Sequence, residues 1–272
     1  MAIFNVQNQW GGNNAPWHTG GVWSLGARQD QNVVDIDINS GDGGKTLTGT
    51  ITYAGEGPIG FKGTQISGNN YAVENQWGGN NAPWHPGGFW LIGGRDSQRV
   101  VSLKISGDQN LNGAMTYQGE GPIGFKGNFE NGSSYNVKNQ WGGNNAPWHE
   151  SGTFILSNRE NQNSVAFDIS SSDGGKTFGG SMTYAGEGPV GFKASNVGLN
   201  IYTVGNQWGG SNAPWHTAGV FVIGARLNQN VVSMKIQSKD GGETFEGQMT
   251  YVGEGPIGFK GVFTSVAVSK PA

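Results

Sequence analysis

The sequence NQWGGNNAPWH at residues 8–18 decides the fold of this chain, because close copies of it recur along the chain. The further copies lie at residues 75–85, 139–149 and 206–216, the last with Ser211 in place of Asn13. Successive copies start 67, 64 and 67 residues apart, so four near-identical units fill the chain. A fixed period of this kind is the signature of a repeat protein.

A second motif follows each copy. It is GEGPIGFK at residues 55–62, with matching runs at 119–126, 186–193 and 253–260. The motif fits the GxGxxG pattern of dinucleotide-binding proteins, which requires a following helix to receive the pyrophosphate. Here a strand pattern follows, Pro58 lacks a backbone donor and Glu56 would repel phosphate. We therefore reject a dinucleotide site.

The composition indicates an ordered protein of low charge. Glycine is abundant, at 50 of 272 residues, but 10 Trp and 13 Phe supply the apolar surface that a packed core needs. A net charge of -3 gives no electrostatic basis for binding nucleic acid or an anionic membrane. The sequence contains no cysteine, so disulfides and thiolate metal sites are excluded.

The first residues, MAIFNVQ, lack the basic and apolar segments of a secretory signal. No apolar run approaches the roughly 18 residues that span a bilayer. We therefore expect a soluble protein that is either cytoplasmic or released without such a signal.

Alternating apolar and polar residues predict five β-strands in the first repeat. We expect them at residues 3–10, 22–28, 33–39, 46–53 and 60–66, with a loop at 11–21 and turns at 29–32 and 40–45. In the fourth strand apolar residues share the inward face with Gly49, and glycine recurs at this place in every repeat. Such a glycine predicts a bend or a close backbone contact. No segment has a helical period, so the predicted fold class is all-β.

A five-stranded unit of about 65 residues is marginally stable alone and leaves two strand edges open. Two units supply ten strands, enough to close a barrel without free edges. Four repeats therefore predict two tandem ten-stranded antiparallel β-barrels. These would cover residues 1–133 (repeats 1–67 and 68–133) and 134–272 (repeats 134–198 and 199–272). A four-bladed propeller is the alternative, although its blades usually have about four strands and 40–50 residues each.

The recurring polar residues fit neither catalysis nor metal binding. One histidine position recurs without the three or four converging ligands that a metal needs, at His18, His85, His149 and His216. We expect these histidines to bond locally or to contact a ligand at a rim. The aspartates that recur, Asp42, Asp173 and Asp240, lie in hairpin turns, which Asp commonly stabilises. A glycosidase needs two carboxylates, and no nucleophile–base set is present, so we predict no enzyme activity, cofactor or metal.

Three aromatic positions recur, and the sequence assigns them different roles. The ring at Trp23, Trp90, Phe154 and Phe221 is expected in the core, because either ring type is accepted. A structural role is favoured for Trp17, Trp84, Trp148 and Trp215, which follow proline. The indoles that precede two glycines, Trp10, Trp77, Trp141 and Trp208, suit stacking on a neutral pyranose beside exposed amides. A recurring Arg and a recurring Glu supply donors and acceptors for sugar hydroxyls.

The motifs NQWGGxxAPW and (M/I)TYxGEGP(I/V)GFK resemble those of the Oscillatoria agardhii agglutinin homologue lectins, over essentially all 272 residues. Length and repeat number are similar to those of a four-repeat member. The resemblance implies one ten-stranded barrel per pair of repeats and recognition of the branched mannose core of high-mannose N-glycans. It also implies agglutination and binding to mannosylated viral envelope glycoproteins.

In that family a site joins Trp-Gly of one repeat to Arg and Glu-Gly of the other repeat in the barrel. The resemblance implies four such carbohydrate-binding sets here: Trp10, Gly11, Arg95, Glu120 and Gly121; Trp77, Gly78, Arg28, Glu56 and Gly57; Trp141, Gly142, Arg226, Glu254 and Gly255; Trp208, Gly209, Arg159, Glu187 and Gly188. Departures such as Leu227 and the shortened turn at 106–110 are expected to change affinity only. The hypothesis is a monomeric, tetravalent lectin. The alternative is a structural or protein-binding β-repeat protein in which these sets only stabilise the fold.

Overall fold

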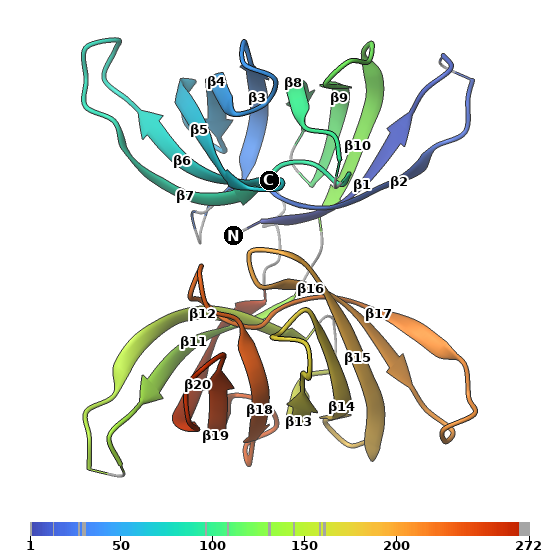
Figure 1. Cartoon of the computed structure of the whole chain (residues 1–272), viewed down its shortest axis with the longest axis vertical. Helices are drawn as coiled ribbons and strands as arrows, with labels where there is room; N and C mark the ends of the chain where they lie inside the picture. Colours follow the sequence, from blue (N-terminus) through green and yellow to red (C-terminus); the bar gives the residue numbers. More distant parts are fainter. Residues whose placement is uncertain are drawn as a thin grey trace. The chain divides into compact units, whose positions relative to one another are not determined.

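The structure is a computed structural model of the whole chain (Figure 1). It describes residues 2–12, 14–26, 28, 31–95, 97–107, 109–129, 132–143, 145–157, 159 and 162–266. The described residues form twenty β-strands, which divide between two compact units. No helix within these ranges is long and apolar enough to span a membrane.

The first unit contains ten strands. They are β1 (Ile3–Gln9), β2 (His18–Ser24), β3 (Val33–Asn39), β4 (Thr46–Tyr53), β5 (Ile59–Ser67), β6 (Asn70–Gln76), β7 (His85–Leu91), β8 (Val100–Ser106), β9 (Asn110–Tyr117) and β10 (Ile123–Phe129). The second unit repeats the same succession. Its strands are β11 (Ser133–Gln140), β12 (His149–Ser157), β13 (Ser164–Ser170), β14 (Thr177–Tyr184), β15 (Pro189–Gly198), β16 (Ile201–Gln207), β17 (Trp215–Val222), β18 (Val231–Gln237), β19 (Thr244–Tyr251) and β20 (Ile257–Val266).

Each unit is a closed antiparallel barrel, as predicted, and the propeller alternative is excluded. The strand order of the first is β1-β10-β9-β8-β3-β4-β5-β6-β7-β2. Strand β1 therefore pairs with β10 of the second repeat, and β3 pairs with β8. The two repeats of a barrel thus complete one another, and the barrel closes between β2 and β7 through the single pair Ser24–Leu91.

The inward face of each barrel carries the predicted alternation. Leu47, Ile51 and Tyr53 of β4 are fully buried, and so are the four rings of the predicted core position, from Trp23 to Phe221. Gly49 has φ 154°, and a Cβ added there would lie 2.1 Å from the Asp37 carbonyl oxygen on β3. The equivalent Gly113, Gly180 and Gly247 approach their partner strands equally closely. The predicted close backbone contact is confirmed.

The predicted strand at 22–28 is wrong at both ends, because β2 covers His18–Ser24. The glycine-rich segment before residue 22 continues the hairpin, with Asn8 opposite His18 and a bulge between Val6 and Gln7. Arg28 consequently lies beyond the strand, in the loop that leads to β3. The predicted turn at 29–32 lies partly outside the described residues.

The aspartate of the β3–β4 hairpin stabilises its own turn, as the sequence predicts. The Thr46 amide donates to Asp42 Oδ1 at 2.8 Å, and the Gly44 amide donates to Ser40 Oγ at 2.8 Å. Hydrogen bonds to the carboxylate, first from the Thr46 amide and then from the Ser40 hydroxyl, lower the pKa of Asp42 to about 2. Asp173 and Asp240 make the same contacts in their own hairpins.

Candidate functional site

The two recurring motifs lie in loops that leave the strands. The NQWGG loops connect β1 to β2 and β6 to β7 in the first barrel, and these hairpins extend on opposite sides of it (Figure 1). The GEG loops connect β4 to β5 and β9 to β10. The strands of the two repeats are arranged in groups around the barrel, with β10-β9-β8 of the second repeat between β1 and β3 of the first, so loops from different repeats become neighbours.

The guanidinium of Arg95 lies between two aromatic rings. Its Cζ is 4.1 Å from the ring centre of Tyr117, at the end of β9, and 5.7 Å from that of Trp10. Burial raises the pKa of Tyr117, so its hydroxyl stays neutral at physiological pH. The cation therefore has a buried ring on one side and a surface indole from the first repeat on the other.

The other three sites repeat this arrangement. The distances from Arg Cζ to Trp ring centre are 5.9 Å for Arg28 and Trp77, 5.8 Å for Arg226 and Trp141, and 5.6 Å for Arg159 and Trp208. Each pair joins two repeats of one barrel. These are the same Trp–Arg pairs that the family resemblance implies.

Each arginine also forms an ion pair with the glutamate of its own repeat. Arg Nη1 and Glu Oε1 are separated by 2.7 Å for Arg28–Glu56, 2.6 Å for Arg95–Glu120, 2.8 Å for Arg159–Glu187 and 2.6 Å for Arg226–Glu254. The paired side chains remain about one-third exposed. An exposed pair of this kind adds little to stability. It does fix the directions in which the remaining donors and acceptors face the solvent.

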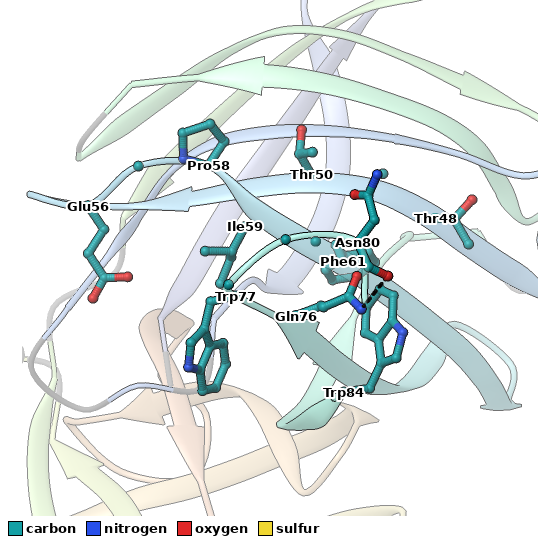
Figure 2. A pocket seen from close by; sticks show the side chains of 15 residues that line it. Thr48, Thr50, Glu56, Pro58, Ile59, Phe61, Gln76, Trp77, Asn80 and Trp84 are labelled. Atoms are coloured by element: carbon teal, nitrogen blue, oxygen red, sulfur yellow. Dashed lines mark hydrogen bonds between the residues drawn. The ribbon is translucent and has the colours of Figure 1, made fainter. Parts of the chain in front are cut away.

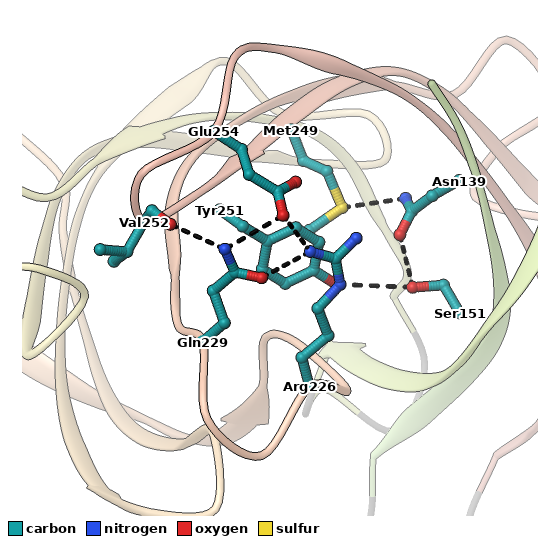
Figure 3. Close-up of polar contacts among 8 residues, drawn as sticks. All are labelled: Asn139, Ser151, Arg226, Gln229, Met249, Tyr251, Val252 and Glu254. Carbon is teal, nitrogen blue, oxygen red and sulfur yellow. Dashed lines mark hydrogen bonds and ion pairs between the residues drawn. The ribbon is translucent and has the colours of Figure 1, made fainter. Parts of the chain in front are cut away.

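A glutamine that the sequence interpretation missed orients both charged groups. Gln229 Oε1 accepts from Arg226 Nη1 at 2.5 Å, while its Nε2 donates to Glu254 Oε1 at 3.1 Å (Figure 3). The same Nε2 donates to the Val252 carbonyl at 2.8 Å, which fixes the amide on the GEG loop. The equivalents are Gln31, Gln98 and Gln162. The spacing Arg-x-x-Gln occurs in all four repeats and is the signal that identifies them.

Hydrogen bonds lower the pKa of Glu56, Glu120 and Glu187. The Gln98 amide, followed by the Arg95 guanidinium, lowers the pKa of Glu120, and Gln31 and Arg28 do the same for Glu56. At Glu187 the order is Arg159 and then Gln162. These carboxylates act as acceptors at neutral pH and in mild acid.

The indoles that precede two glycines are exposed. Trp10 exposes 44% of its surface, Trp77 and Trp141 expose 46% each, and Trp208 exposes 42%. Three of them stack on the histidine of their own loop, with ring centres 4.4 Å apart for Trp10–His18, 4.6 Å for Trp77–His85 and 4.5 Å for Trp141–His149. His216 instead meets Trp208 edge-on, at 78° between the planes. Each histidine therefore makes a local ring contact with the indole of its own hairpin.

The glycines of the two motifs differ in their surroundings. Gly11, Gly78, Gly142 and Gly209 have φ between 95° and 100°, which L side chains rarely adopt. Gly57, Gly121, Gly188 and Gly255 have no atom within 4 Å of an added Cβ. The Glu-Gly glycines therefore border open space next to the glutamate and indole.

A groove of about 710 Å³ is lined by four residues of the Trp77 set, namely Trp77, Gly78, Glu56 and Gly57 (Figure 2). Glu56 and Gly57 line one end of it, Trp77 stands along it, and Trp84 and Thr48 lie at the other end. This volume is within the range of small-molecule sites, about 300–1,000 Å³.

Two of the tryptophans that follow proline, for which a structural role is favoured, lie at the surface. Trp84 and Trp215 expose 39% and 40% of their surface, so they are not core residues. Lysines of neighbouring strands cover three of the four indoles: Lys126 over Trp17, Lys193 over Trp215 and Lys260 over Trp148. The sequence gives no sign of their exposure, because it does not reveal that they lie on the outer face of a barrel.

Within the described residues, no three His, Cys, Asp or Glu side chains come together as a metal site. What recurs at each site is one exposed indole, one guanidinium, one carboxylate and backbone amides of glycine. These groups define a recognition site for an uncharged, polyhydroxylated ligand, repeated four times on an all-β scaffold.

Residues 2–66, 69–130, 133–197 and 200–264 each match the OAA-family lectin sugar binding domain. The chain therefore belongs to the OAA-family lectins, which are carbohydrate-binding proteins and not enzymes.

Its relatives match either most of the chain or about half of it. The myxobacterial hemagglutinin of Myxococcus xanthus is 57% identical over 263 residues, which cover 96% of this chain and 98% of that protein. Lectin OAA of Planktothrix agardhii is 63% identical over 129 residues, covering 46% of this chain and 98% of that protein. Among solved structures, the M. xanthus hemagglutinin in complex with α3,α6-mannopentaose matches with TM-score 0.71 at 55% identity, covering 96% of this chain and all of that one. The Burkholderia oklahomensis agglutinin matches with TM-score 0.70 at 59% identity, covering 96% and 94%.

Proposed function

We propose that each of the four clusters binds the branched mannose core of a high-mannose N-glycan. The exposed indole stacks on the C–H face of a pyranose, glycine amides donate to hydroxyls, and Arg and Glu offer a donor and an acceptor for neighbouring hydroxyls. The observation that carries the proposal is the fourfold recurrence of one exposed Trp beside an Arg–Glu–Gln set from the other repeat of its barrel. The mannopentaose complex of the M. xanthus hemagglutinin supports the choice of ligand.

The proposed contact residues are the twenty of the four sets given above, from Trp10 to Gly188, with two sites in each lectin domain (1–133 and 134–272). Four sites on one chain allow cross-linking of glycoproteins. Such multivalency raises avidity by about 10²–10⁴ over a single site. Agglutination and binding to mannosylated viral envelope glycoproteins follow from the same property.

Calorimetry with α3,α6-mannopentaose tests the proposal. The full chain should bind about four equivalents, and Arg95→Ala should bind one fewer with a Tm close to that of the parent, because exposed ion pairs add little stability. Loss of folding in Arg95→Ala, together with no glycan binding by the parent chain, would support the structural alternative.

A further inference from the structure

The groove at the Trp77 site continues beyond the residues of the proposed mannose site. From Glu56 and Gly57 it runs past Trp77 to Trp84, so one continuous depression joins two exposed indoles (Figure 2). Both indoles belong to the β6–β7 loop. Gln76, between them in the view, donates through Nε2 to the Asn80 and Ala82 carbonyls and so fixes the shape of this loop.

The far half of the groove is polar but uncharged. Thr48, Gln76 and Asn80 line it beside Trp84, and among the described lining residues Glu56, at the near end, is the only charged one. Hydroxyl and amide groups around an indole provide the same chemistry as the proposed mannose site, without its ion pair. This lining favours a neutral sugar over an ionic or wholly apolar ligand.

Trp84 differs from its three equivalents in the position of the neighbouring lysine. In the other repeats the lysine Nζ lies over the indole, at 4.2 Å from the ring centre of Trp17, 4.4 Å from Trp215 and 4.8 Å from Trp148. Lys62, the equivalent lysine here, instead pairs with Glu74 at 2.9 Å, and no cation–π contact to Trp84 occurs among the described residues.

The partner of Lys62 lies on the neighbouring strand. Glu74 of β6 faces Lys62 of β5 directly. Lys126 and Lys193 face no acidic residue on either neighbouring strand. Lys260 faces Glu246, but the two charged groups are 3.7 Å apart and the ammonium still lies over Trp148. The closer pair with Glu74, at 2.9 Å, holds the Lys62 ammonium away from Trp84.

We propose that Trp84 forms an additional pyranose subsite, which binds a further sugar of the glycan whose mannose core occupies the Trp77 site. This subsite rests on the proposed function and makes the Trp77 site the one that distinguishes larger glycans from the pentaose. At the Trp10 site the Lys126 ammonium covers the equivalent indole, so no such preference arises there.

The test isolates the Trp77 site in the full chain by Arg95→Ala, Arg159→Ala and Arg226→Ala. Calorimetry compares α3,α6-mannopentaose with a larger high-mannose N-glycan that contains it. We expect the larger glycan to bind about three- to tenfold more tightly, the gain of one stacking contact. Adding Trp84→Ala should abolish this difference and leave the pentaose affinity unchanged.

Glu74→Gln provides a second variant that removes no aromatic surface. It reproduces the Gln7 of the first repeat and frees Lys62 to move over Trp84, so the preference for the larger glycan should also fall.

The matched control isolates the Trp10 site by Arg28→Ala, Arg159→Ala and Arg226→Ala, where Trp17→Ala should change neither affinity. If Trp84→Ala and Glu74→Gln both keep the full preference, or if no preference exists, the subsite is refuted while the lectin function stands. If neither glycan binds the isolated Trp77 site, the proposed function fails as well.

Discussion

Arg95 and Trp10 lie in different repeats, 85 residues apart in sequence, yet the guanidinium carbon is 5.7 Å from the indole ring centre. The contact exists because β1 of the first repeat closes the barrel against β10 of the second. Each site combines the indole of one repeat with the guanidinium and carboxylate of the other repeat. The site therefore forms only in the closed barrel. Single substitutions can test glycan binding and folding separately.

Gly121→Ala should remove binding without harming the fold. An added Cβ at Gly121 meets no protein atom within 4 Å, so the change should alter the free energy of unfolding by less than about 0.5 kcal/mol. The methyl group would instead occupy space next to Glu120, where the ligand is proposed to lie. Calorimetry with mannopentaose should lose one of four equivalents while the thermal transition stays in place. An unchanged stoichiometry would show that the glycan does not approach this loop.

Gly49→Ala is the control for Gly121→Ala. It should destabilise the fold without placing a methyl group in the binding site. Its Cβ would lie 2.1 Å from the Asp37 carbonyl oxygen, and φ is 154°, so β3 and β4 would have to separate. We expect a loss of about 3 kcal/mol or more in the free energy of unfolding. Urea unfolding measures it. A loss below about 1 kcal/mol would mean that the strands move apart with little cost.

Gln98→Ala should weaken the Trp10 site by acting on its charged groups. Gln98 binds both Arg95 Nη1 and Glu120 Oε1, so its removal frees both side chains to take other rotamers. We expect an affinity about three- to tenfold lower at this site, and a Glu120 pKa closer to its ordinary value. Titration of the carboxyl carbon by NMR detects the second effect. A role in stability alone would move Tm and leave that pKa unchanged.

Glycan binding should be constant from neutral pH down to mild acid. In the folded chain the pKa of Glu56, Glu120 and Glu187 is lowered from the ordinary value of 4.5, so these carboxylates stay ionised above that pH. Their contribution to stability is likewise present above 4.5 and is lost as pH falls through the lowered pKa. Affinity measured against pH should fall only below 4.5. A decline between pH 7 and 5 would show that these carboxylates do not control binding.

His18→Ala should weaken the Trp10 site more than His216→Ala weakens the Trp208 site. His18 stacks on its indole at 16° between the planes, whereas His216 meets Trp208 edge-on. Removing the stacked ring frees the indole to leave the orientation that presents its face to a sugar. The expected loss at Trp10 is about two- to tenfold, the value of an aromatic pair. Equal losses in the two variants would mean that the stacking geometry does not matter.

The sequence alone determined the architecture of this protein. The fourfold repeat, the period-two alternation in segments such as 46–53 and the need to close strand edges were enough to predict two ten-stranded barrels. The recurrence of glycine on the inward face of the fourth strand also predicted the close backbone contact at Gly49. Motif resemblance, and not spacing, supplied the choice of Arg95 as the partner of Trp10.

Only the tertiary structure decided how the side chains of the sites are arranged. The Gln98 bridge, the ring contact of His18 and the exposure of Trp84 depend on which groups meet across strands. Lys62 shows the reason most clearly, because it pairs with Glu74 of the next strand, whereas the equivalent lysines of the other repeats lie over an indole. The repeated sequence predicts repeated strands. Which of two partners a side chain contacts depends on the register between strands, and the order of residues along the chain does not show that register.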